Sequence, residues 1–207
     1  MRYGLAAWGL REESLESQLA LTKKLGLELL EFSIANYDKD ALQLGATDAQ
    51  IEHVKELFRQ NGIRLECGCT GNDFTGDDVA EQVKKVKEVV GIAEKLGLRY
   101  LRIFAGFNSD SVVIGERLVK MLAALKEVND YAKNTGVRLC VETHGGVACL
   151  ENGALVHFNS ATTRTDIWKE IVKTGVSCAY DPANLTAVGT TCATGFFRQF
   201  KEAVAYV

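Results

Sequence analysis

A junction that recurs along the chain is the feature of this sequence that most constrains its fold. Each copy has a helix-like segment ending near Lys or Arg, then a glycine, then a short apolar run. The glycines are 36, 35, 39 and 39 residues apart: Gly26, Gly62, Gly97, Gly136 and Gly175. Glycine adopts the left-handed conformation that closes a helix, and cations favour the negative end of the helix dipole. The apolar run that follows is typical of a strand buried between layers.

The segments between these glycines have helical periodicity. In 79–96, for example, valines recur every three or four residues with Lys and Glu between them. Alternating strands and helices imply a parallel sheet built through right-handed crossovers. We predict strands at 2–8, 27–33, 63–68, 98–104, 137–143, 176–180 and 204–207, and helices at 13–25, 47–61, 77–96, 111–135, 162–174 and 195–203.

This pattern predicts an α/β fold of the (β/α) barrel type, with six βα units and the start of a seventh strand in one partial barrel domain over 1–207. An eightfold barrel with this period needs roughly 250 residues, so the barrel is expected to be incomplete. An open doubly wound sheet is the alternative. No Gly-x-Gly-x-x-Gly follows the first strand, which weakens that alternative.

Composition excludes several classes of protein. With 47% hydrophobic and 25% charged residues, the chain is typical of a soluble globular domain. A net charge of −3 without clustered Lys and Arg argues against nucleic-acid binding, and the lack of a long apolar run predicts no membrane span. The first residues lack a signal-peptide pattern. We therefore expect a cytoplasmic protein whose cysteines are reduced thiols: Cys67, Cys69, Cys140, Cys149, Cys178 and Cys192.

Two carboxylates occupy matching places in the repeat. Glu142 lies six residues after Gly136, and Asp181 lies six residues after Gly175. Equal offsets predict that both side chains lie at a similar height, at the carboxyl ends of neighbouring strands, where barrel enzymes carry their active sites. The alternation of side chains along a strand places His144 on the same face as Glu142.

Two inward carboxylates on adjacent strands repel each other unless a shared proton or a divalent cation lies between them. Oxygen ligands suit Mg²⁺ or Mn²⁺, and a nearby imidazole extends the choice to Zn²⁺, Co²⁺ or Fe²⁺. The alternative is that Glu142 and Asp181 are unrelated surface carboxylates. His144 is a candidate metal ligand, a candidate hydrogen-bond partner of a substrate, or a loop histidine.

Four segments resemble one known family. VETHGG at 141–146 and AYDPANL at 179–185 are similar to the fifth- and sixth-strand motifs of the xylose isomerase-like TIM barrel family. LRYLRIFAG at 98–106 resembles the fourth strand, and LLEF at 29–32 resembles the second. The family includes sugar isomerases, ketose 3-epimerases, dehydratases and apurinic endonucleases.

The resemblance implies a metal-dependent proton transfer. The family's isomerases and epimerases hold a divalent metal through a glutamate, an aspartate, a histidine and a second glutamate. Glu142 and Asp181 match the first two, so the metal is expected there as Mn, Mg, Co or Zn. Glu142 is also the expected catalytic residue, moving a proton through an enediolate. The expected substrate-binding residues are His144, Asn184, Glu31 and Arg102.

The chain departs from the family pattern at two places. Asn184 stands where several members have a histidine, and an amide cannot carry a proton. The chain also ends at Val207, before the third metal ligand and the second catalytic glutamate of the family. We expect a fragment of a longer protein. The alternatives are a partner chain that supplies the missing strands and a shortened, inactive relative.

The favoured function is that of a divalent-metal-dependent isomerase or epimerase of a small sugar or polyol, inactive as these 207 residues alone. One alternative is a dehydratase of a cyclic polyol or keto acid on the same fold. The other is a non-catalytic truncated barrel that acts as a binding or assembly module, in which a homo-oligomer covers the open barrel edge. A nucleic-acid role like that of the endonucleases is disfavoured because those enzymes carry further metal-binding histidines.

Overall fold

The computed structural model describes residues 2–189 and 193–207. The chain groups into two compact units. The first comprises Met1–Gly71, Lys85–Arg102 and Ala132–Arg138, and the second comprises Asn72–Lys84, Ile103–Tyr131 and Leu139–Val207. Each unit is described below by itself, and the single domain expected over the whole chain stays a prediction.

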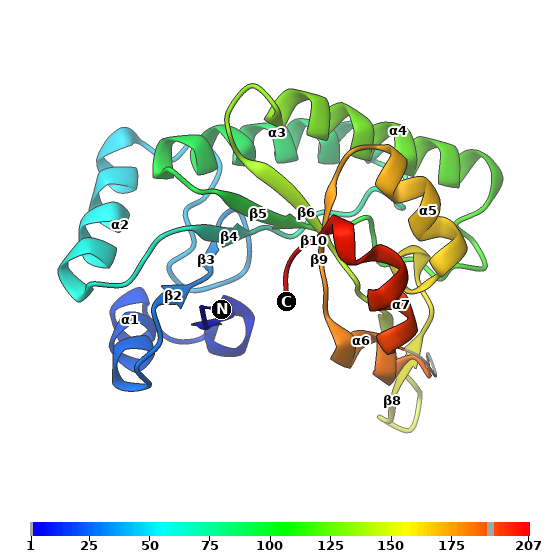
Figure 1. Cartoon of the computed structure of the whole chain (residues 1–207), viewed down its shortest axis with the longest axis horizontal. Helices are drawn as coiled ribbons and strands as arrows, with labels where there is room; N and C mark the ends of the chain where they lie inside the picture. The colour runs from blue at the N-terminus through cyan, green and yellow to red at the C-terminus, as the bar shows by residue number, and fades with distance from the viewer. Residues whose placement is uncertain (1, 190–192) are drawn as a thin grey trace. The chain divides into compact units, whose positions relative to one another are not determined.

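The first unit is built on short parallel strands (Figure 1). β1 (Gly4–Leu5) pairs with β2 (Leu29–Leu30). β4 (Cys67–Cys69) lies between β3 (Phe32–Ser33) and β5 (Tyr100–Ile103), and all three run parallel. The other elements are the 3-10 helix η1 and the helices α1, α2 and most of α3, with bounds Ala7–Leu10, Leu15–Lys24, Asp48–Asn61 and Val79–Leu96.

Helix α2 shows how the sequence specifies its own boundaries. Thr47 and Gln50 form a reciprocal capping box at its start, which satisfies two backbone N–H groups that have no partner within the helix. Its apolar face is buried, and the Phe58 ring meets the Phe32 ring of β3 edge-on at 6.0 Å between centroids. Helix α2 therefore turns one apolar stripe inward, and Phe58 of that stripe packs against β3.

The second unit contains three parallel strands in the order β6, β9 and β10, with bounds Arg138–Glu142, Ser177–Ala179 and Val204–Tyr206. A separate antiparallel hairpin is formed by β7 (Gly146–Cys149) and β8 (Leu155–Phe158). The helices are α4, α5, α6 and α7, with bounds Gly115–Ala132, Thr165–Lys173, Pro182–Ala187 and Ala193–Phe200. The 3-10 helices η2 and η3 cover Ala161–Thr163 and Lys201–Ala203.

An aromatic cluster forms much of the core of the second unit. The Trp168 ring of α5 meets the Phe196 ring of α7 edge-on at 5.6 Å, and the Tyr180 ring stacks on Phe196 at 6.0 Å. Tyr180, which directly follows β9, therefore faces the helices, as side-chain alternation along the strand predicted at 176–180 indicates. By the same alternation, Asp181 does not point toward this aromatic cluster.

The glycine repeat is confirmed by the backbone. All five glycines have left-handed backbone angles, with φ from 68° to 89°: Gly26, Gly62, Gly97, Gly136 and Gly175. Each lies just after a helix, and Gly62 is the left-handed cap of α2. The strands and helices next to these glycines are correct in type, and most are shorter by a few residues than predicted. Two strands differ more: the one predicted at 27–33 is divided into β2 and β3, and the one predicted at 63–68 shares only residues 67 and 68 with β4.

Three predictions of local structure were incomplete. The strand predicted at 2–8 is limited to β1 at Gly4–Leu5, because the 3-10 helix η1 begins at Ala7. No strand was predicted in the segment 144–161, but it contains the β7–β8 hairpin, whose turn carries Asn152 and Gly153. Asn-Gly between apolar residues is a strong hairpin signal. Helix α6 was also missed, although Asp181 at its cap and Pro182 at its first position are a typical helix start. Within the described residues, every helix is too short or too polar to cross a lipid bilayer.

Gly91 inside α3 and Gly97 just after it should respond in opposite directions to substitution by alanine. Gly97→Ala places a Cβ in open space but at φ +75°, so we expect a loss of about 1 kcal/mol in the free energy of unfolding. Gly91→Ala, also in open space but inside the helix, should gain about 0.5–1 kcal/mol. Urea denaturation of both variants measures this. Equal effects of the two substitutions would contradict the left-handed assignment of Gly97.

Candidate active site

The second unit brings Glu142 and Asp181 together, but not at equal height. The register pairs Glu142 at the end of β6 with Ala179 at the end of β9, so Asp181, the cap residue of α6, lies two residues beyond the partner of Glu142. The expectation of similar height from equal offsets was therefore wrong. Neighbouring strands are staggered, as barrel-type sheets require, and counting from the glycines does not reveal that stagger.

One amide joins the two carboxylates. The side-chain nitrogen Nδ2 of Asn184 donates to Oε1 of Glu142 at 3.1 Å and to Oδ2 of Asp181 at 2.9 Å. An amide NH₂ carries two donors, and a carboxylate only accepts, so this arrangement satisfies both acidic groups at once. Three of the residues expected at the site, Glu142, Asp181 and Asn184, thus form one connected group. Glu142 within it is 8% exposed.

Asp181 is oriented by the helix that it begins. Its Oδ1 accepts hydrogen bonds from the backbone N–H groups of Ala183 at 2.8 Å and Asn184 at 3.1 Å. Pro182 at the first helical position lacks an N–H group and has a backbone angle already suited to the helix. The helix start therefore holds Oδ1, while Oδ2 faces the amide of Asn184. The same short helix places Asn184 three residues later, beside Glu142.

Thr143 fixes the end of β6 against Asp181. Its hydroxyl accepts from the Asp181 N–H at 2.7 Å and donates to the Asp181 carbonyl at 3.1 Å. The side chain is fully buried. Since Thr143 directly follows Glu142, these two hydrogen bonds determine how far apart the two acidic residues lie. Sequence reasoning missed this role because alternation turns Thr143 away from the face that carries Glu142.

His144 is held by hydroxyl groups and aromatic rings of the second unit. Its backbone N–H donates to Oγ1 of Thr162 at 2.9 Å, and its carbonyl accepts from the hydroxyls of Thr162 and Ser160. The imidazole lies edge-on to the Phe104 ring at 5.2 Å and to the Phe107 ring at 5.5 Å between centroids. The ring orientation of His144 is thus defined by packing, as a substrate-binding group requires.

The two candidates in the first unit pair with each other. Arg102 donates through Nε to Oε1 of Glu31 at 2.9 Å and through NH2 to Oε2 at 3.0 Å. Both side chains are largely buried. This bidentate geometry is the strongest form of a carboxylate–guanidinium pair, so Glu31 and Arg102 form a fixed polar unit rather than two independent groups.

The cysteines near these groups are thiols. Burial, with a further contribution from Glu31, raises the pKa of Cys67 to about 11. Burial, and then the charge of Glu142, raises the pKa of Cys178 to about 12. The expected reduced state is confirmed for the described cysteines: Cys67, Cys69, Cys140, Cys149 and Cys178. Cys192 lies outside the described residues.

The donor set at Glu142 and Asp181 fits a divalent ion only in part. Two carboxylates are hard oxygen ligands of the kind that Mg²⁺ and Mn²⁺ prefer. Among residues 2–189 and 193–207, however, no group of three or more His, Cys, Asp or Glu side chains is arranged to hold a metal. An ion held by Glu142 and Asp181 would therefore need further ligands.

The hydroxyl of Thr143 provides a direct test of this geometry. Thr143→Val keeps the shape but leaves the part-buried Asp181 N–H and carbonyl without that partner, so we expect a loss of about 1–3 kcal/mol in unfolding free energy. Thr143→Ser keeps the hydroxyl and should cost less. Urea denaturation of both variants is the measurement. A valine variant as stable as the serine variant would show that these hydrogen bonds do not hold the site.

Comparisons with known proteins support the fold described above. No curated protein matches the chain significantly. Among solved structures, an L-ribulose 3-epimerase matches with a TM-score of 0.74 at 19% identity, covering 100% of this chain and 68% of that one. A probable 3-DHS dehydratase, AsbF from Bacillus anthracis, matches with a TM-score of 0.70 at 13% identity, covering 100% and 72%.

A third solved structure, a xylose isomerase domain protein from Planctomyces limnophilus, matches with a TM-score of 0.69 at 14% identity. The match covers 91% of this chain and 66% of that one, so the chain spans slightly less than two thirds of its length. The family model described as xylose isomerase-like TIM barrel matches residues 19–206. The expected fold and the resemblance are thereby confirmed: the chain belongs to the xylose isomerase-like TIM barrel family.

Proposed function

We propose that this chain forms part of an isomerase or epimerase that moves a carbon-bound proton of a small sugar or polyol, with Glu142 as the base. One observation carries the proposal. A buried carboxylate at the end of a parallel strand is joined through the Asn184 amide to a second carboxylate, Asp181. The L-ribulose 3-epimerase among the solved structures that this chain resembles supports the reaction class.

The chemistry follows from the position of Glu142. A carboxylate within hydrogen-bond reach of a carbon beside a carbonyl removes its proton, and the substrate becomes an enediolate. Return of the proton to the neighbouring carbon, with transfer of a hydroxyl proton between the two oxygens, gives isomerisation. Protonation of the original carbon from the opposite face, by a second acid that lies there, gives epimerisation. A divalent ion held by Glu142 and Asp181, with further ligands, would acidify that proton and stabilise the negative charge that develops.

The remaining residues are proposed to bind and orient the substrate. Asn184 donates to both carboxylates and keeps an amide oxygen for a sugar hydroxyl. His144, fixed by the rings of Phe104 and Phe107, offers an imidazole nitrogen. Glu31 and Arg102 stay proposed substrate-binding residues, and within the first unit they are held in fixed geometry by their own pairing. We propose a cytoplasmic location because the five cysteines that the structure describes are free thiols.

A dehydratase is the second candidate, favoured by the AsbF match. Proton removal beside a carbonyl begins both reactions, and loss of water then replaces reprotonation. The two outcomes differ in product mass. Mass spectrometry of the reaction with ketoses, cyclic polyols and keto acids therefore separates them: an isomer keeps the mass of the substrate, whereas a dehydrated product is lighter by one water.

Glu142→Gln should abolish proton transfer. An amide keeps the shape but cannot accept the proton, so we expect exchange of the substrate proton with D₂O to fall on the order of 100-fold or more. Proton NMR with a ketose panel and Mn²⁺, using the full gene product, gives the rate. Glu151→Gln at the exposed hairpin turn is the matched control and should leave the rate unchanged. Undiminished exchange in Glu142→Gln would rule out Glu142 as the base.

Asn184→Asp should strengthen the binding of a divalent ion. The change replaces the amide between Glu142 and Asp181 with a third carboxylate, and oxygen sites gain affinity as charged ligands are added, so we expect roughly tenfold tighter Mn²⁺ binding. Isothermal titration calorimetry measures the affinity without any assay of turnover. Asn152→Asp at the hairpin turn adds the same charge elsewhere and is the control. Equal Mn²⁺ affinities for the Asn184 variant and the parent would contradict a metal at this pair.

A further inference from the structure

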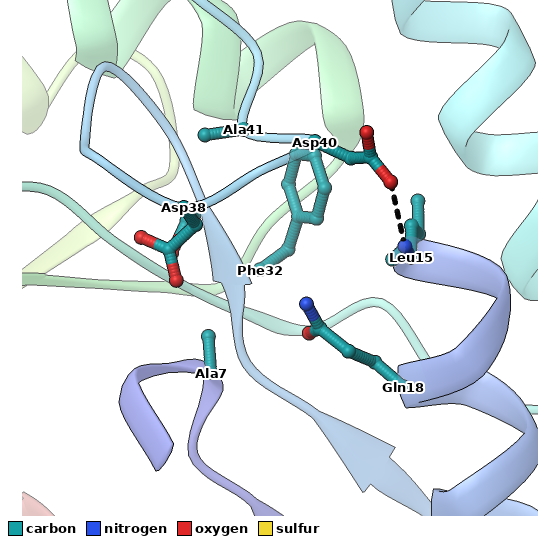
Figure 2. A pocket seen from close by; sticks show the side chains of 8 residues that line it. Ala7, Leu15, Gln18, Phe32, Asp38, Asp40 and Ala41 are labelled. Atoms are coloured by element: carbon teal, nitrogen blue, oxygen red, sulfur yellow. Dashed lines mark hydrogen bonds between the residues drawn. The ribbon is translucent and has the colours of Figure 1, made fainter. Parts of the chain in front are cut away.

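A small pocket lies in the first unit, beside the loop that follows β3 (Figure 2). Its polar lining comes from Asp38, Asp40, Gln18 and Ser33, and its apolar lining includes Phe32. The pocket has room for one species of about the size of a water molecule. None of these residues takes part in the proton transfer proposed above.

Asp38 is the unusual member of this pocket. Its side chain is only 5% exposed. Both carboxylate oxygens are buried, and neither has a hydrogen-bond partner among the residues that the structure describes. A buried carboxylate without compensation is strongly destabilising, and proteins resolve this with a counter-charge, hydrogen bonds or a bound ion. The lining contributes no Lys, Arg or His side chain as a counter-charge.

The surrounding groups favour a cation. Asp40 also lines the pocket, but its carboxylate is turned away from Asp38, and its Oδ2 accepts from the Leu15 N–H at 2.8 Å (Figure 2). Gln18 uses its amide nitrogen for the carbonyls of Leu10 at 3.2 Å and Glu13 at 3.1 Å, so its side-chain oxygen remains as an acceptor. Ser33 adds a hydroxyl oxygen, which also hydrogen-bonds with the Cys69 sulfur at 3.3 Å. Carboxylate, amide and hydroxyl oxygens are the ligands of hard cations.

We propose that this pocket binds one alkali-metal ion, Na⁺ or K⁺, against the Asp38 carboxylate. A tightly held transition metal does not fit, because no group of three or more His, Cys, Asp and Glu is arranged to hold a metal within the described residues. A single ion satisfies the negative charge in a space of this size. Bound there, it fastens the loop after β3 beside the start of α1, to which Asp40 already bonds.

The test compares thermal unfolding in NaCl, KCl and N-methylglucamine chloride at equal ionic strength. For a cation at 100 times its dissociation constant, we expect the melting temperature to rise on the order of 5 °C above that in N-methylglucamine. Asp38→Asn should abolish the difference between salts. Asp77→Asn, which removes an exposed carboxylate, should keep it. Glu142→Gln should also keep it, which separates this site from the proposed proton transfer.

Three results would overturn the proposal. The first is equal stability of the parent protein in the three salts. The second is an Asp38→Asn variant that is more stable than the parent in every salt, because the carboxylate would then be an uncompensated charge with no ion. The third is a salt difference that persists in that variant. If Asp38→Asn fails to fold, ²³Na NMR of the parent protein decides. Broadening of the ²³Na line that added K⁺ reverses supports the site, and the absence of such broadening refutes it.

Discussion

The need to hold two like charges close together governs the second unit. Glu142 and Asp181 come from different strands, and Coulomb repulsion would separate them without a group between them. The Asn184 amide meets that need by donating to both. Its position depends on α6, which begins at Asp181, and Thr143 hydrogen-bonds to the Asp181 backbone. The end of β6, the start of α6 and the Asn184 amide thus depend on one another for their positions.

Much of the fold could be predicted from the sequence because its signals are local. A glycine that follows a helix end with Lys or Arg favours the left-handed conformation whatever its tertiary surroundings. All five predicted glycines adopt that conformation. The identities of Glu142 and Asp181 were accessible for the same reason, since each ends an apolar run. What could not be predicted was relative placement: the two-residue stagger between β6 and β9 depends on strand pairing, which no local pattern records.

The sequence also did not predict which residues far apart along the chain contact each other. Glu31 and Arg102 were expected to contact substrate, and nothing in their spacing of 71 residues indicated that they bind each other. Asp38 gave no signal at all, because an aspartate in a loop is usually solvated, and only burial shows that it is not. Asn184 was read as a weaker substitute for histidine. In the structure the Asn184 amide donates to both carboxylates, which allows the two acidic side chains to lie close together.

The β7–β8 hairpin has a practical consequence for engineering. Its base adjoins His144, whose backbone is secured by Ser160 and Thr162, while its tip around Asn152 and Gly153 is exposed and closed by its own turn. Exposed polar tips of this kind accept inserted sequence with little effect on the fold. A fluorophore or peptide grafted at this tip could therefore report on the neighbourhood of the imidazole without disturbing the hydroxyl groups that anchor it.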